Sequence, residues 1–210
     1  MSDSEVWQAK AALVELAAKE RMYRDTGRWR LMEASYYHDS HVRVSWFNGS
    51  GHDFVKASSR MVQDGQKWSS GLHLVGPTSV ELNGDRAVAD TGCTVNRRHF
   101  VGDVELDSVL FVRHRSMVER GTDGIWKLRS FRAVYERDQI ALVVPGDTVH
   151  VDKARLAEYR ASYRFLSYFT ELEGGVVDST LPGVDRPDLV DEVIAEDEGW
   201  LAGGSYTPRL

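Results

Sequence analysis

The spacing of apolar residues changes along the chain, from a helical period near the N-terminus to alternation further on. Residues 4–23 carry apolar side chains at intervals of three and four, and Ser4 is available as an N-cap, which predicts a helix with one apolar face. Gly27 is expected to end this helix. The elements predicted next are a second helix over 29–37, a turn at 38–40, a strand over 42–47, a turn at 48–51 and a third helix over 53–66.

Beyond residue 70 the apolar pattern has a period of two, which is typical of strands. Asn83-Gly84-Asp85 and Asp123-Gly124 interrupt it, and Asn-Gly and Asp-Gly pairs are strong hairpin signals. Helices followed by a meander of long strands favour an α+β domain in which a curved antiparallel sheet wraps around the N-terminal helices and leaves an interior. The predicted strands cover 72–82, 86–97, 104–115 and 125–138.

Helical patterns return after residue 140, over 153–170 and 189–201, with glycine and proline breaks between them. The sequence therefore divides into a domain over 1–140 and a helical C-terminal extension over 141–210. Because the extension is acidic and aromatic, we expect it to pack on the domain or on a neighbouring subunit. It could cover a pocket, exchange onto a neighbour or extend an interface.

Composition narrows the classes of partner. The 210 residues carry a formal net charge of -6 and scattered basic side chains, so we expect no nucleic acid partner. The sequence contains no signal-peptide pattern and no apolar run of membrane-spanning length, which predicts a cytoplasmic protein without a membrane partner. Cys93 is the only cysteine; it excludes an internal disulfide and is expected to be a small buried side chain.

Two residues carry candidate acid–base chemistry. Asp25 lies at the end of the first predicted helix, and His73 opens the first strand of the meander. A carboxylate that holds an imidazole fixes the ring tautomer and stabilises the imidazolium after the ring has taken a proton. Because 48 positions separate the two residues, only the fold could bring them together. Alternatively, Asp25 terminates its helix and His73 is a hydrogen-bonded core residue.

Three motifs together resemble a known family. They are Tyr23-Arg24-Asp25-Thr26-Gly27-Arg28-Trp29, then Gly71-Leu72-His73-Leu74, and Asp123-Gly124-Ile125-Trp126-Lys127-Leu128 at the end of the meander. In this order, residues 5–140 resemble the SnoaL-like branch of the NTF2-like superfamily. The similar enzymes are scytalone dehydratase, bile acid 7α-dehydratase and hexachlorocyclohexane dehydrochlorinase. The last motif indicates the fold, whereas the Asp25 and His73 pair discriminates this branch.

The resemblance implies an NTF2-like cone with a deep apolar pocket and an Asp-His dyad. His73 would remove a proton from substrate carbon, Asp25 would hold its ring, and loss of a leaving group would complete an elimination. It also implies a cofactor-independent lyase acting on a small hydrophobic or polycyclic substrate, in a homo-oligomer with a trimer favoured over a dimer. The expected substrate-binding residues are Tyr23, Trp46, Phe54, Met61, Trp68, Arg97, His99, Phe111 and Phe131.

Other functions stay open at this point. The same dyad could drive an isomerisation or a cyclisation, and the fold could serve as a non-catalytic ligand-binding or assembly module. We expect no metal, because His38, His41 and His52 lack the spacing of a closed metal site. Glu20 and Arg24 stand where the similar dehydratases carry tyrosines, so the polarising phenol would have to come from another residue such as Tyr36 or Tyr37.

Overall fold

The computed structural model describes residues 1–63 and 71–208 of the chain. The first helix, α1, begins with a reciprocal capping box between Ser2 and Glu5 rather than at Ser4, and it ends at Asp25. Gly27 follows with a positive φ of 70°, a conformation that glycine adopts without strain. The N-terminal elements are α1 (Asp3–Asp25), α2 (Trp29–Ala34), β1 (Tyr36–Val44), β2 (Phe47–Ser50) and α3 (Gly51–Gln63).

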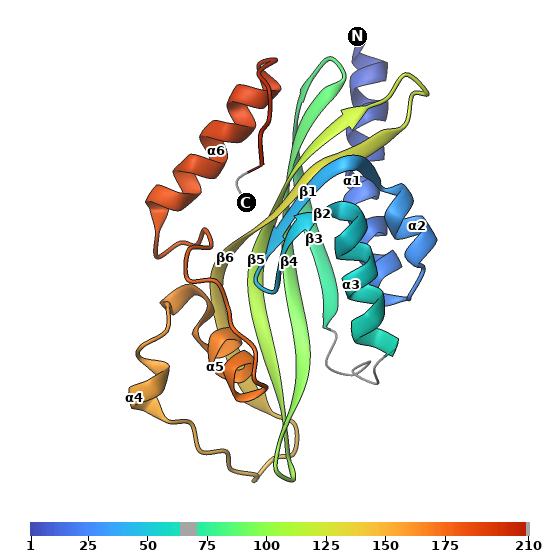
Figure 1. Cartoon of the computed structure of the whole chain (residues 1–210). Helices are drawn as coiled ribbons and strands as arrows, with labels where there is room; N and C mark the ends of the chain where they lie inside the picture. Colours follow the sequence, from blue (N-terminus) through green and yellow to red (C-terminus); the bar gives the residue numbers. More distant parts are fainter. Residues whose placement is uncertain (64–70, 209–210) are drawn as a thin grey trace.

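Four long strands follow and confirm the predicted meander. They are β3 (Leu72–Asn83), β4 (Arg86–Val101), β5 (Val104–Arg120) and β6 (Trp126–Leu142). With β1 and β2 they form one curved sheet in the order β2-β1-β6-β5-β4-β3 (Figure 1). One pairing departs from the predicted antiparallel sheet, because β1 pairs with β6 in parallel.

The segment before β2 also differs from the prediction. β1 begins at Tyr36, so residues assigned to the second helix and to a turn at 38–40 lie in a strand. The predicted turn at 48–51 is largely β2, and the chain reverses instead at Ser45 and Trp46. Tertiary pairing overrides local preference here: β1 lies between β2 and β6, which supply hydrogen bonds on both sides.

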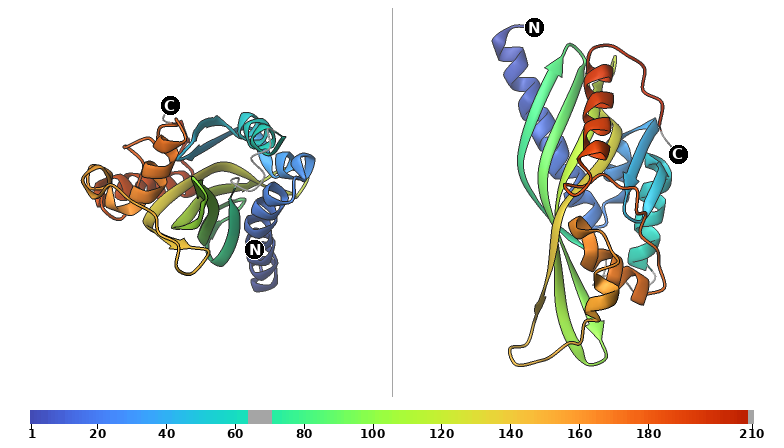
Figure 2. Two further views of the ribbon diagram at one scale, coloured as in Figure 1. Left: turned by 90° about the horizontal axis from the view of Figure 1, so that it is seen from below. Right: turned by 90° about the vertical axis from the view of Figure 1, so that its left-hand side faces the viewer.

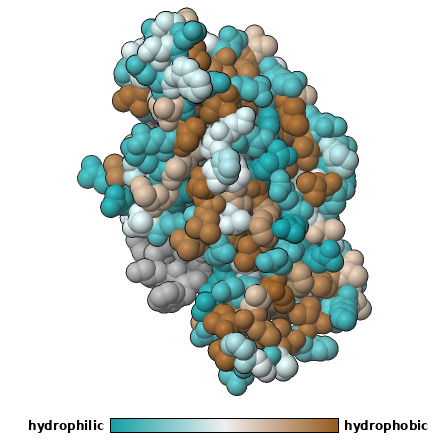
Figure 3. All heavy atoms as spheres, turned by 180° about the vertical axis from the view of Figure 1, so that it is seen from behind, coloured by the Kyte–Doolittle hydropathy of each residue, from teal (hydrophilic) through white to brown (hydrophobic). Residues whose placement is uncertain are grey.

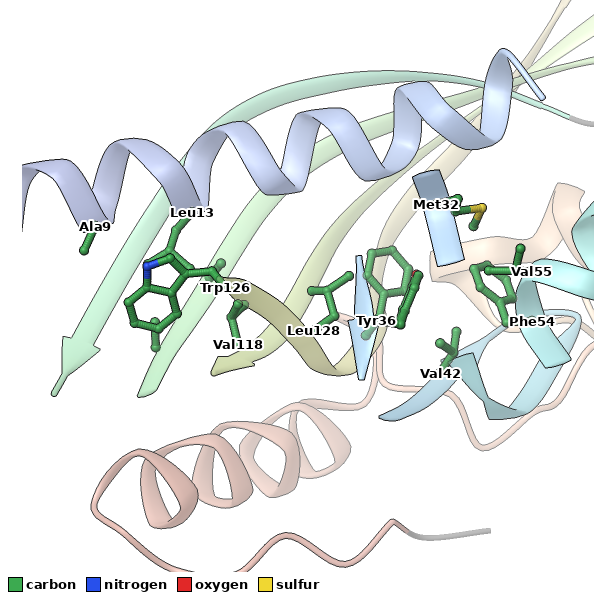
Figure 4. Packing of buried hydrophobic residues seen from close by; sticks show 13 residues of the cluster. Ala9, Leu13, Met32, Tyr36, Val42, Phe54, Val55, Val118, Trp126 and Leu128 are labelled. Atoms are coloured by element: carbon green, nitrogen blue, oxygen red, sulfur yellow. The ribbon is translucent and has the colours of Figure 1, made fainter. Parts of the chain in front are cut away.

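We call the face of the sheet that α1 and α3 cover the inner face. Leu13 of α1 lies there beside Trp126 and Val118 of the strands, and Phe54 of α3 packs on Tyr36 of β1 (Figure 4). The opposite, outer face is covered by α6 (Pro187–Leu201), whose Trp200 packs on Val88 and Met117. Figure 2 shows α1 and α6 on different sides of the strands.

The extension is held to the sheet by buried charges and by its own short helices. Asp197 of α6 is 1% exposed and binds both Arg115 and Arg132 of the outer face. The helix predicted over 153–170 is divided into α4 (Lys153–Leu156), a 3-10 turn (Ala161–Tyr163) and α5 (Arg164–Leu172). Arg160 explains the division, because its guanidinium binds the carboxylate of Asp185 and the carbonyl oxygen of Leu181.

No helix in the described parts of the chain is both long and apolar enough to cross a membrane.

Candidate active site

A cavity of about 180 Å³ lies over the inner face of the sheet, between the C-terminal ends of α1 and α3 on one side and α5 on the other. Its middle is apolar and is formed by strand residues such as Val95, Leu110 and Val112. Polar side chains gather toward its ends. The lining residues from the helices, the extension and the β1–β2 turn are Arg21, Arg24, Ser45, Trp46, Phe54, Met61, Leu166, Thr170, Glu173 and Val177.

The fold brings Asp25 and His73 into direct contact. Asp25 is the last residue of α1, and its Oδ2 accepts a 2.7 Å hydrogen bond from the backbone N–H of His73 in β3. Its Oδ1 lies 2.8 Å from Nδ1 of the His73 ring. The two side chains are only 11% and 7% exposed, and His73 lines the cavity. One carboxylate thus holds both the strand and the imidazole at the edge of the cavity.

The protonation state of the pair follows from its surroundings. Burial lowers the pKa of His73 to about 4, against the opposing effect of the bond to Asp25. The hydrogen bonds from His73, together with the positive charge of Arg24, keep the pKa of Asp25 below its usual value despite the burial of the carboxyl. At neutral pH a carboxylate that only accepts therefore faces a neutral ring, so Nδ1 must carry the proton. Nε2 is therefore unprotonated and carries a lone pair, as a general base requires.

Two arginines of α1 place positive charge beside this pair. Burial lowers the pKa of Arg24 to about 10, so its guanidinium is still charged at neutral pH, and it lies 3.4 Å from Asp25. Arg21 is held by Glu20, which also accepts a 2.7 Å hydrogen bond from the Tyr36 hydroxyl. Glu20 is therefore both paired and buried, at 1% exposure.

A second histidine, His114 of β5, faces the same end of the cavity. Its ring centroid is 6.3 Å from that of His73 and 4.7 Å from that of Phe131. Burial, reinforced by the charge of Arg21, holds the pKa of His114 well below its usual value, so this ring is neutral as well. The dyad end of the cavity thus combines two neutral imidazoles with two arginine side chains.

Seven of the nine predicted substrate-binding residues divide into three groups. Trp46, Phe54, Met61 and Arg97 line the cavity. Tyr23 and Phe131 do not; they pack in the core beside it. Trp68 lies outside the described residues. Figure 4 shows the Phe54 ring within this core cluster.

His99 and Phe111 differ from the prediction for reasons that the sheet makes clear. Phe111 pairs with Arg137, whose guanidinium lies 4.4 Å from its ring centroid, and alternation puts it on the opposite face from Leu110 and Val112. His99 is on the inner face, but it is only 4% exposed and does not line the cavity.

The contacts of His99 instead fasten the extension to the sheet. Its Nε2 lies 2.8 Å from the Ser108 hydroxyl and its Nδ1 lies 3.0 Å from Glu173 at the end of α5. The ring also stacks on Phe169, with centroids 4.7 Å apart. Glu173 binds Arg97 too, so this network closes the cavity at the α5 side.

The prediction did not name several residues that the structure places in the cavity. Arg21 and Arg24 could have been found from spacing, because they continue the buried stripe of Ala9 and Leu13 at helical intervals. His114 follows the inward alternation of β5. The residues from the extension had no local signal. No group of three or more potential metal ligands occurs in residues 1–63 and 71–208.

The curved six-stranded sheet with helices over its inner face is an NTF2-like fold. The chain belongs to the family of the SnoaL-like domain, which it matches over residues 5–132. Pea pathogenicity protein 2 of Fusarium vanettenii is 28% identical over 165 residues, which cover 78% of this chain and 70% of that protein. An uncharacterised protein of Emericella nidulans is 30% identical over 183 residues, which cover 84% of this chain and 76% of that protein.

Solved structures agree with this fold. A protein assigned as a scytalone dehydratase, from Novosphingobium aromaticivorans, superposes with a TM-score of 0.53 at 16% identity and covers 77% of this chain and 95% of its own. Hexachlorocyclohexane dehydrochlorinase of Novosphingobium barchaimii superposes with a TM-score of 0.54 at 15% identity, covering 71% of this chain and all of its own. At such identities the likeness is one of fold.

Asp25→Asn should lower the pKa of His73 further and change its tautomer. The carboxylate is the group that raises the pKa of the buried ring, so its loss leaves desolvation and the arginine charges to act alone. An amide N–H can also donate to Nδ1, which would move the ring proton to Nε2. Nitrogen NMR shifts of the ring at neutral pH report the tautomer, and Asp53→Asn, at an exposed carboxylate on α3, is the control. An unchanged tautomer in Asp25→Asn would contradict the assignment.

Proposed function

We propose that the protein is a cofactor-independent lyase in which His73 abstracts a proton from a carbon atom of a small hydrophobic substrate. The observation that carries this proposal is the bond between Nδ1 of His73 and the Asp25 carboxylate, because it leaves the other ring nitrogen unprotonated in a side chain that lines the cavity. Membership of the SnoaL-like family, with dehydratase and dehydrochlorinase structures of the same fold, supports this class of chemistry.

The proposed reaction is an elimination next to a carbonyl group. Nε2 of His73 takes a proton from the α carbon, and the electron pair of the C–H bond moves to form an enolate. The enolate then expels a hydroxide or another leaving group from the β carbon, which forms the C=C bond. Asp25 stabilises the transient imidazolium by charge and hydrogen bonding.

Arg24 is the candidate for stabilising the enolate oxygen. Its guanidinium lines the cavity beside Asp25 and keeps its positive charge at neutral pH. A buried cation stabilises a developing oxyanion more strongly than it would in water, because the surrounding dielectric is low. The sequence pattern of the similar dehydratases has tyrosines at the positions of Glu20 and Arg24. We propose that the Arg24 guanidinium takes the role of their phenol, which is to polarise the substrate carbonyl.

Hydrogen exchange at carbon tests the proposal without knowledge of the natural substrate. Cyclic ketones of one to three rings, with and without a β hydroxyl, are incubated with the protein in heavy water and followed by proton NMR. We expect exchange of the α protons above the buffer rate for ketones that bind, and a conjugated enone from the β-hydroxy ketones. Binding without exchange across the whole panel would contradict a proton-abstracting enzyme and favour a ligand-binding module.

Two finer points belong to this proposal. An isomerase or cyclase would share the first step, and only the fate of the enolate separates them from a dehydratase. Self-association is supported by exposed apolar side chains such as Leu72, Leu74, Phe100 and Val144, and the resemblance to the similar enzymes favours a trimer over a dimer. Figure 3 shows that apolar atoms form patches on the rear face of the molecule, among polar ones.

A further inference from the structure

We propose that Asp138 binds a neutral hydroxyl or carbonyl oxygen of the substrate, at the end remote from the carbon atom that His73 attacks. This inference rests on the proposed function, since it assumes that the reacting end lies at His73. The substrate class is thereby defined further: an apolar molecule with an oxygen-containing group at each end.

The first observation is a row of four residues on the inner face, each paired directly with the next across neighbouring strands. His73 of β3 pairs with Val95 of β4, Val95 pairs with Leu110 of β5, and Leu110 pairs with Asp138 of β6. Directly paired residues share one face of a sheet, and all four line the cavity. Three strand spacings of about 4.8 Å place the two end residues about 14 Å apart along the sheet, less across its curved interior.

The second observation is a β-bulge that turns Asp138 inward. Val112 pairs with Tyr135, whereas the preceding Phe111 pairs with Arg137, so Glu136 is an extra residue in β6. Without it, strict alternation from Tyr135 would send residue 138 to the outer face. The bulge therefore aims a carboxyl group at an apolar cavity, and such re-aiming of a side chain is typical of bulges next to functional sites.

The third observation is an incomplete set of hydrogen bonds. Oδ2 of Asp138 accepts a 2.8 Å bond from the backbone N–H of Leu166, in the first turn of α5. Oδ1 is buried and has no hydrogen-bond partner among the residues that the structure describes. An unsatisfied buried oxygen is costly, and a ligand in the cavity that Asp138 lines would satisfy it.

The charge state of Asp138 favours a neutral partner. Burial raises the pKa of the carboxyl to about 6, and the backbone N–H groups of Leu166 and Phe165, together with the charge of Arg164, oppose the shift only in part. The protonated form can donate to a carbonyl oxygen, and either form can accept from a hydroxyl. A substrate carboxylate would instead meet repulsion once Asp138 ionises.

The experiment compares three probes that differ at one position: α-tetralone, the same molecule with a hydroxyl on the remote ring, and the same molecule with a carboxylate there. Affinities are measured by calorimetry. In the wild type we expect the hydroxyl probe to bind roughly five- to tenfold more tightly than the parent ketone, which is the effect of one neutral hydrogen bond. Asp138→Leu should abolish this preference, and Asp138→Asn, whose amide still donates and accepts, should keep most of it.

The carboxylate probe supplies a second readout, the change of its affinity with pH, which a folding defect in the variant would not reproduce. It should bind the wild type at least tenfold more weakly at pH 8 than at pH 5, and Asp138→Asn should remove that difference. Among the described residues, the other titratable or charged groups near this end are Arg164 of α5, Glu173 directly after that helix, Arg97 of β4 and Tyr135 of β6. They are unchanged in the variant, so they cannot account for the difference. Glu136→Gln, at the bulged residue beside Asp138, is the matched control because its carboxylate binds Arg113 of the outer face.

The outcomes separate the two proposals. A hydroxyl preference that Asp138→Leu leaves intact, or equal binding of the parent and hydroxyl probes by the wild type, overturns the role of Asp138 even if α-proton exchange is catalysed. A preference that depends on Asp138 supports it, even if no exchange is detected and the lyase proposal fails. Failure of all three probes to bind the wild type overturns the two-ended substrate class.

Discussion

Replacing His73 with glutamine should lower the rate of catalysed α-proton exchange by about 10³-fold, within the range of 10²–10⁴ typical of a positioned general base. Glutamine is polar and of similar length but has no basic nitrogen. Asp25→Asn should lower the rate by a similar factor, because an amide that donates to Nδ1 leaves the proton on Nε2, where the base is needed. Initial exchange rates by proton NMR, with a ketone shown to bind each variant, give the comparison.

The pH dependence of the exchange rate provides an independent check. Since the pKa of His73 is about 4, the ring is protonated and inactive only in acid. The rate should therefore rise with pH through this value and stay level through neutrality. His52→Gln is the matched control: its ring is half exposed on α3, where it binds Glu33, so the exchange rate should not change. Full activity in His73→Gln, or an acid limb near the ordinary histidine pKa, would contradict His73 as the buried base.

The contact between Asp25 and His73 shows what a sequence pattern can predict. Asp25 and His73 could be paired because each lies at the end of a regular element, and the order of elements in the SnoaL-like fold brings those two ends together. The inward alternation of the strands was equally readable. The prediction applied this alternation wrongly at Phe111. Its neighbours Leu110 and Val112 line the cavity, so Phe111 lies on the outer face.

The remainder of the cavity depends on features with no local signal. Asp138 faces inward only because β6 carries an extra residue, and a bulge of this kind leaves the alternation pattern around it almost unchanged. Glu173 and Leu166 reach the cavity because the extension folds back over the sheet. Arg160 directs part of that path through tertiary contacts with Asp185, which a helical periodicity cannot reveal.

Arg21→Met should lower the free energy of unfolding by about 3–5 kcal/mol, the cost of leaving one partner of a buried ion pair without the other. Arg21 is 3% exposed and Glu20 is 1% exposed, and the guanidinium binds both carboxylate oxygens of Glu20. Methionine fills much of the arginine volume, so the loss reports the unpaired carboxylate rather than a cavity. Denaturant unfolding at neutral pH measures it. Lys19→Met on the same helix is the control, because its ion pair with Glu15 is at the surface and should matter little.

The double variant Glu20→Gln with Arg21→Met tests the electrostatic cause. Removing both charges should restore most of the lost stability, since a neutral amide can still accept the 2.7 Å hydrogen bond from the Tyr36 hydroxyl. If instead the double variant is as unstable as Arg21→Met, the loss comes from packing, in particular from the guanidinium that lies 4.5 Å from the centroid of the Phe131 ring. Because Arg21 also lines the cavity beside His73, recovery of stability without recovery of exchange would show that the ion pair supports the dyad as well as the fold.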